Sequence, residues 1–137
     1  MTVLADFTTI IHDLPQGLDV PVQAGKQSPV GTKFNAGGRL GEGSGQTGEL
    51  AAFIMFSVLN LQIPLHVFVN SDINDPVGTM DPNSAPGWNS QVITISGGRL
   101  NSDGINNQIS VAIPPTVPVG TTTFKIKNLI CFYHQDS

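Results

Sequence analysis

The sequence predicts an all-β protein built as an antiparallel two-sheet sandwich, and three observations support this prediction. The most apolar stretch of the chain, residues 49–70, alternates apolar and polar side chains over its second half. Turn-forming residues are frequent, with 15 Gly and 10 Pro among 137 residues. No segment repeats its apolar residues with the period of a helix.

The central stretch predicts the core. Successive side chains of a strand point to opposite faces, so one row of its second half is expected to face inward. Residues 51–58 are apolar at nearly every position, as in a strand that is buried on both faces or meets another subunit. Asn60, Gln62 and His66 argue against a membrane span. The expected inward row is Leu59, Leu61, Ile63, Leu65 and Val67.

The remaining core strands are expected at residues 91–96, 105–113 and 121–134, with a long loop over residues 71–89. The last of these strands alternates apolar residues with lysines. Its even positions are expected to face one way and Lys125 and Lys127 the other; those even positions are Phe124, Ile126, Ile130 and Phe132.

Residues 1–48 are predicted to form an N-terminal arm with a glycine-rich loop, partly packed on a sandwich domain of residues 49–137. They hold nine of the fifteen glycines and no long apolar alternation. Gly43, Gly45 and Gly48 fit the pattern G-x-G-x-x-G, but no buried strand precedes them, no helix pattern follows, and Gln46 stands where a phosphate loop has Lys. We interpret this run as a flexible loop.

Composition limits the function. Charged residues make up 12% of the chain, about half the usual share, which suits a surface covered by partners or by copies of the chain. Six Lys and Arg and a net charge of −4 argue against nucleic acid. The N-terminus lacks the pattern of a secretory signal, and one cysteine excludes an internal disulfide, so synthesis in the cytoplasm is expected.

The order of strand endings resembles that of galactose-binding-like domains. It comprises Val67-Phe-Val-Asn70, a loop with Trp88, Ile93-Thr-Ile95, Gly104-Ile-Asn-Asn-Gln-Ile-Ser-Val111 and a closing strand from Phe124. The resemblance covers roughly residues 50–133 and departs at Ser71-Asp72, where a long loop replaces the family's tight turn. It implies a jelly-roll β-sandwich, and a carbohydrate-binding function becomes one candidate.

Catalytic residues, a metal site and a cofactor are not expected. The three histidines, His12, His66 and His134, lie near no nucleophile motif. Cys131 with His134 would supply only half of a metal site, so Cys131 is interpreted as a small core or interface residue.

The long loop carries the candidate ligand residues. Its acidic cluster, residues 72–81 with Asp72, Asn74, Asp75 and Asp81, either binds Ca²⁺ or makes turns. Trp88 either stacks on a sugar or closes the end of the sandwich. A lectin site would consist of Trp88, Asp72, Asn74 and Asp75.

Two functions therefore remain. The first is a non-enzymatic structural protein of a virus-like particle, such as a capsid decoration or cement protein or a tail-attached β-module, located in the virion. It would bind copies of itself, with a trimer as the first expectation, and a particle protein, without nucleic acid or membrane. The second is a carbohydrate-binding module or lectin.

Overall fold

The structure is a computed structural model that describes residues 3–11, 14–35, 52–82, 86–95, 99–101 and 105–136. These residues form nine strands and no α-helix, which confirms the all-β prediction. The described part of the chain accordingly holds no helix long and apolar enough to cross a membrane. The strands are β1 Val3–Ile11, β2 Leu18–Gln23, β3 Ser28–Pro29, β4 Ala52–Leu59, β5 Leu65–Val69, β6 Gly78–Met80, β7 Asn89–Ile95, β8 Ile109–Ala112 and β9 Thr121–Asp136.

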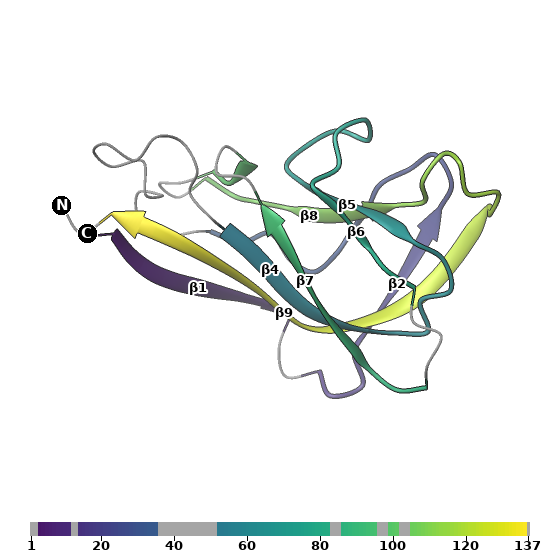
Figure 1. Cartoon of the computed structure of the whole chain (residues 1–137), viewed down its shortest axis with the longest axis horizontal. Helices are drawn as coiled ribbons and strands as arrows, with labels where there is room; N and C mark the ends of the chain where they lie inside the picture. The colour runs from purple at the N-terminus through teal and green to yellow at the C-terminus, as the bar shows by residue number, and fades with distance from the viewer. Residues whose placement is uncertain are drawn as a thin grey trace.

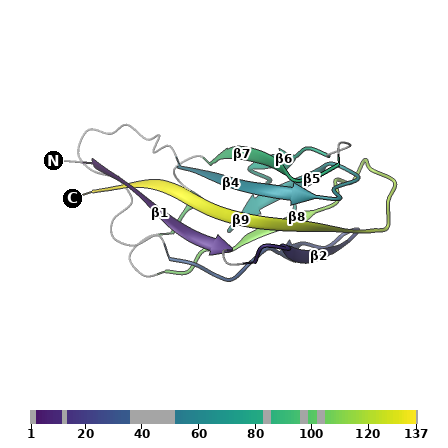
Figure 2. The ribbon, with the colours of Figure 1, turned by 90° about the horizontal axis from the view of Figure 1, so that it is seen from below.

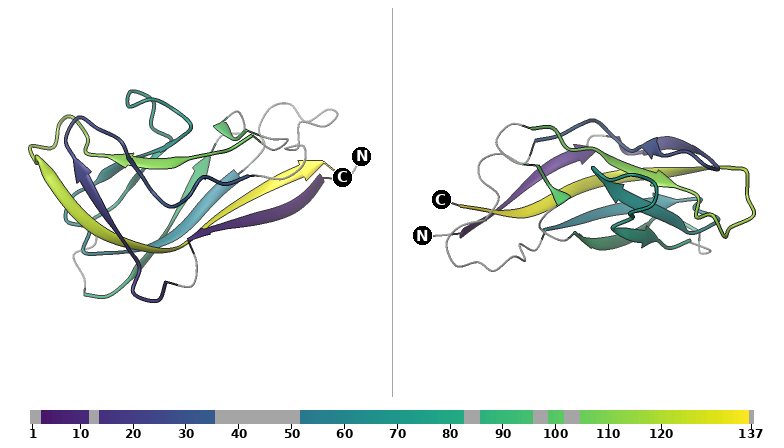
Figure 3. Two further views of the ribbon diagram at one scale, coloured as in Figure 1. Left: turned by 180° about the vertical axis from the view of Figure 1, so that it is seen from behind. Right: turned by 90° about the horizontal axis from the view of Figure 1, so that it is seen from above.

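The strands form two antiparallel sheets that face each other (Figures 1 and 3). Sheet A has the order β1-β9-β4-β7, and β2 also pairs with β9. Sheet B has the order β3-β8-β5-β6. The long strand β9 pairs with β2 along its first half and with β1 along its second half, while β4 lies on its other side. The inward side chains of both sheets form one hydrophobic core.

The central apolar stretch is divided between the two sheets. β4 lies in sheet A and buries its even positions, whereas β5 lies in sheet B and buries its odd positions. The chain crosses between the sheets at residues 60–64, beginning with Asn60 in a left-handed conformation (φ 61°). The expected inward row is therefore right for Leu61, Leu65 and Val67, which are buried. Ile63, within the crossing, is half-buried and also packs against the core, whereas Leu59 is half-buried at the end of β4 and is not part of the core cluster.

The alternation in β9 also changes partway along the strand. Phe124 and Ile126 are buried as expected, but Ile130 and Phe132 point outward, which corrects the prediction. The cause is a bulge at Asn128, whose φ of 54° is left-handed. Pairing with β4 accordingly shifts by one residue between Met55 and Ser57. Beyond the bulge the buried residues are Leu129, Cys131 and Tyr133.

Much of the predicted arm belongs to the sandwich. β1 and β2 pair with β9, and β3 pairs with β8. Their buried residues Ile10, Ile11, Val20 and Val22 complete the core, although each apolar run is too short to be recognised as a core strand. An extended arm is therefore not confirmed for these residues, and residues 36–48 lie outside the described part of the chain.

The predicted long loop between residues 71 and 89 contains β6. Its three residues pair with β5, from Val67↔Gly78 to Leu65↔Met80. The sequence Gly-Thr-Met offers no alternation, so only the tertiary pairing reveals this strand.

Candidate functional site

Trp88 lies half-buried on the outer side of sheet A, just before β7. Its ring packs against the turn at Gly17, where an added Cβ would lie 2.5 Å from Trp88 Cη2. Lys127 Nζ lies 4.2 Å from the centroid of the ring, a cation–π contact. A glycine turn and a lysine therefore both contact the tryptophan ring.

The acidic residues of the β5–β6 loop make internal contacts. Asp72 accepts a hydrogen bond from the backbone N–H of Asn74 at 2.8 Å. This is the geometry expected if the acidic residues make turns. Asp75 accepts two hydrogen bonds from the guanidinium of Arg99, one of them 2.7 Å from Nη2 to Oδ1. These hydrogen bonds lower the pKa of Asp75 below its ordinary value.

The four residues of the predicted lectin site do not come together. Asp75 binds Arg99, which follows the end of β7, whereas Trp88 directly precedes the start of β7. A strand of seven residues spans about 23 Å, so the acidic loop and the tryptophan lie toward opposite ends of β7. Figure 1 shows this separation of the β5–β6 loop from the beginning of β7.

Metal-binding and nucleophilic groups are also dispersed. Among the described residues no three His, Cys, Asp or Glu side chains gather closely enough to hold a metal ion. Cys131 is fully buried in the core, and this burial raises the pKa of its thiol to about 12. The interpretation of Cys131 as a core residue is thereby confirmed.

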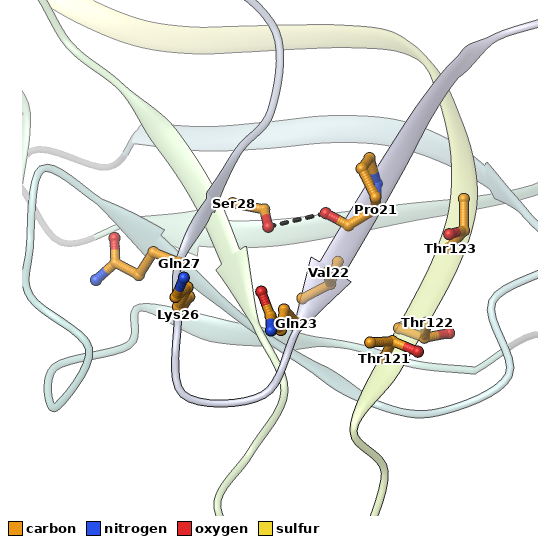
Figure 4. A pocket seen from close by; sticks show the side chains of 9 residues that line it. All are labelled: Pro21, Val22, Gln23, Lys26, Gln27, Ser28, Thr121, Thr122 and Thr123. Atoms are coloured by element: carbon orange, nitrogen blue, oxygen red, sulfur yellow. Dashed lines mark hydrogen bonds between the residues drawn. The ribbon is translucent and has the colours of Figure 1, made fainter.

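A hollow of about 490 Å³ lies between the β2–β3 turn and the start of β9 (Figure 4). Its polar groups are three threonine hydroxyls, two glutamine amides, Ser28 and Lys26. Ser28 Oγ donates to the carbonyl of Pro21 at 2.9 Å, and the Gln27 amide bonds both Ser71 and Ser110. Ser28 and Gln27, two of the polar residues that line the hollow, therefore already form hydrogen bonds within the protein.

A group of exposed and half-buried apolar side chains lies on the outer side of sheet A, and we call it the apolar outer face. Two cross-strand rows build it, and in Figure 2 the strands that carry them lie side by side across the sheet. One row runs from β1 through β9 and β4, and the other runs from β9 through β4 to β7. Its residues are Phe7, Phe132 and Phe53 in the first row and Ile130, Met55 and Val92 in the second.

Aromatic contacts organise the first row. Phe53 and Phe132 stack with their ring centroids 4.8 Å apart, and Phe7 adjoins Phe132 at 6.0 Å. Phe7 is 58% exposed and Phe53 is 36% exposed, while Val92 in the second row is 58% exposed. Exposed aromatic and aliphatic residues gathered on four strands are typical of an interaction surface.

On the outer side of sheet B, in contrast, the central positions are buried. Phe68, Ser110 and Ala112 alternate with the inward residues of β5 and β8, yet all three are buried. Gln27 spans part of this side, accepting from Ser110 Oγ at 2.7 Å and donating to the carbonyl of Ser71 at 3.0 Å. Among the described residues, the apolar outer face of sheet A thus exposes more apolar surface than these central positions of sheet B.

The sequence indicated only part of this face. The apolar character of residues 51–58 on both sides predicts a strand that is buried on both faces or meets another subunit, and Phe53 and Met55 lie within this stretch. The alternation of β9 predicts Ile130 and Phe132 on the same side as Phe124, because the bulge at Asn128 has no sequence signal strong enough to reverse an alternating pattern.

Comparison with known proteins adds no relative. No family model matches the chain, and no curated protein and no solved structure does so.

Proposed function

We propose that the protein is a jelly-roll β-sandwich that serves as a non-enzymatic structural component of a virus-like particle. The strand order supports the jelly-roll assignment. Taking β1 and β2 as one interrupted strand leaves eight strands, and each sheet interleaves early with late strands: β2-β9-β4-β7 and β3-β8-β5-β6. Jelly rolls of eight strands in two Greek keys occur in viral capsid proteins and in lectins.

The observation that carries the assembly function is the apolar outer face. At 58% and 36% exposure, Phe7 and Phe53 leave about 200 Å² of aromatic surface in water. Covering that surface contributes about 5 kcal/mol, which offsets part of the cost of association. Such a patch forms the apolar core of an interface whose total area is about 800 Å² on each partner.

The low charge of the chain supports the same function. Only 12% of its residues are charged, and none of the six residues that make up the face is, so covering them desolvates no charge of their own. We propose that the partners are copies of the chain, with a trimer as the first candidate, and a capsid or other particle protein. The virion is the proposed location.

Sedimentation of two matched variants tests this proposal. Phe53→Thr removes the central stacked ring while keeping a residue that favours strands, and we expect it to weaken assembly at least about tenfold. Ile73→Thr is the control, because Ile73 is equally exposed (37%) but lies in the β5–β6 loop, and it should leave assembly unchanged. Equal behaviour of the two variants contradicts the proposal.

A carbohydrate-binding module is the second candidate. It is favoured by the hydroxyl-lined hollow at the β2–β3 turn and by Trp88 with Lys127 beside it. A glycan array separates the two functions. Specific binding that is lost in Trp88→Ala, or in Thr122→Val within the hollow, would establish the lectin function and contradict the structural one.

A further inference from the structure

The two edges of sheet A differ in how they are protected against pairing with another strand. The edge formed by β2 carries Pro21 at its middle, which lacks a backbone N–H, and Asp19, which is ion-paired with Lys125 at 2.9 Å. Neighbouring β1 is interrupted by a bulge between Thr9 and Ile11. Proline, charge and bulges are the usual means by which edge strands avoid association.

The opposite edge, β7, has none of these devices. Its seven residues contain no proline and no charged residue. Its pairing with β4 runs without a shift from Ala52↔Ile95 to Val58↔Asn89. β7 is therefore a regular, uncharged edge strand of average length.

The outer backbone edge of β7 is also open in the described part of the chain. No described strand pairs with it on that side, and no described backbone hydrogen bond outside the strand ladders involves residues 89–95. β6 approaches β7 through a side chain instead. Gln91 Nε2 donates to the carbonyl of Asp81 at 2.8 Å, and its Oε1 accepts from the N–H of Asp81 at 2.9 Å. This contact fixes β6 without using the backbone of β7.

The apolar outer face reaches this edge. Val92 ends the second cross-strand row, with Met55 and Ile130 behind it, and 58% of its surface is exposed. Ser90 and Thr94 flank Val92 on the same side of the strand. A strand added beside β7 would cover Val92 and would also form hydrogen bonds with the backbone N–H and C=O groups on the outer edge of β7.

We propose that β7 pairs antiparallel with β7 of a second copy, around a two-fold axis that passes through Val92. Residue 92 is the midpoint of β7, so this register pairs Asn89 with Ile95, Ser90 with Thr94 and Gln91 with Ile93 of the other copy, along the full strand. No like charges meet, because the strand carries none. The interface is isologous, the commonest symmetry of soluble oligomers.

This inference rests on the proposed self-assembly and specifies its basic unit. Pairing at β7 makes that unit a dimer rather than a trimer, and it joins the two copies of sheet A into one continuous sheet. The two apolar outer faces then lie side by side on the same surface. A particle protein would meet a face twice as large as that of one chain.

Disulfide cross-linking tests the register. In the proposed dimer the two Val92 Cα atoms lie about 4.5–5.5 Å apart, which suits a disulfide. Ser90 opposes Thr94 of the other copy, whereas the two Ser90 residues are displaced by about 14 Å along the strands. The native Cys131 does not interfere, because its side chain is fully buried.

We therefore expect Val92→Cys to form a covalent dimer under mild oxidation. Neither Ser90→Cys nor Thr94→Cys should cross-link by itself, but a mixture of the two should yield a heterodimer. Gln23→Cys, an exposed position on the protected β2 edge, is the control and should stay monomeric on denaturing gels. Two results would overturn the proposal. One is that Gln23→Cys cross-links as efficiently as Val92→Cys. The other is that neither Val92→Cys nor the mixture of Ser90→Cys and Thr94→Cys forms a cross-link.

Charge variants separate this inference from the proposed function. Val92→Lys places two ammonium groups face to face at the axis and should raise the dissociation constant at least about tenfold, while Gln23→Lys should not. If assembly survives Val92→Lys but is lost in Phe53→Thr, the β7 pairing is wrong and assembly through the face stands. A protein that never associates contradicts both.

Discussion

Replacing Gly17 with alanine probes how the only tryptophan of the chain is held. Gly17 has a φ of 79°, a left-handed conformation that costs about 1–2 kcal/mol for a residue with a Cβ. Its added Cβ would also lie 2.5 Å from Trp88 Cη2 and 3.2 Å from the carbonyl oxygen of Ile126. Displacing the ring adds about 1–3 kcal/mol, so we expect Gly17→Ala to lower the free energy of unfolding by about 2–5 kcal/mol.

Gly25→Ala is the matched control for this prediction. Gly25 has nearly the same φ, 80°, and nothing lies within 4 Å of its added Cβ. Its replacement should cost only the conformational part, about 1–2 kcal/mol. Urea unfolding followed by Trp88 fluorescence measures both variants. Equal losses in the two variants would refute the packing of Trp88 on Gly17.

Three further predictions concern single residues. Asn128→Gly should retain the bulge and stability, whereas Asn128→Val should cost about 1–3 kcal/mol in urea unfolding, because a β-branched residue resists a φ of 54°. The pKa of Asp75 is lower in the folded protein than the ordinary value of 3.8, so the contribution of its carboxylate to stability is present above pH 3.8 and is lost as the pH falls through the folded pKa. Unfolding measured as a function of pH should therefore show a smaller loss of stability on the acid side in Asp75→Asn than in the unmodified protein. The Cys131 thiol should resist a thiol reagent at pH 8 and react fully after unfolding, since burial raises its pKa to about 12 and shields it; reaction at equal rates in both states would contradict its core position.

The sequence predicts the fold class because strand alternation is a local signal. Residues 59–70 and 124–127 show it clearly, and their apolar positions are mostly buried. The signal fails where the backbone changes direction or register. Asn60 moves the chain from one sheet to the other, and Asn128 reverses the faces of β9. Each effect depends on a single residue in the left-handed conformation, and the presence of an asparagine in the sequence does not by itself predict that conformation.

The site was harder to predict because it depends on which strands become neighbours. Phe7, Phe53 and Phe132 lie far apart in the sequence and meet only through the pairing of β1, β9 and β4. By contrast, Asp72 and Asp75 are close in sequence, and what the sequence does not predict is that Asp75 forms an ion pair with the distant Arg99. The sequence of residues 1–48 resembles an arm because it shows no long apolar alternation, even though the described part of β1 and β2 contributes Ile10, Ile11, Val20 and Val22 to the core.

The molar mass of the unmodified protein, measured by light scattering across the micromolar range, tests the central claim most directly. The account predicts a concentration-dependent oligomer whose assembly beyond the β7-paired dimer is lost in Phe53→Thr and retained in Ile73→Thr. A monomer at all concentrations, with unchanged mass in both variants, would contradict the proposal that the apolar outer face of sheet A exists for assembly.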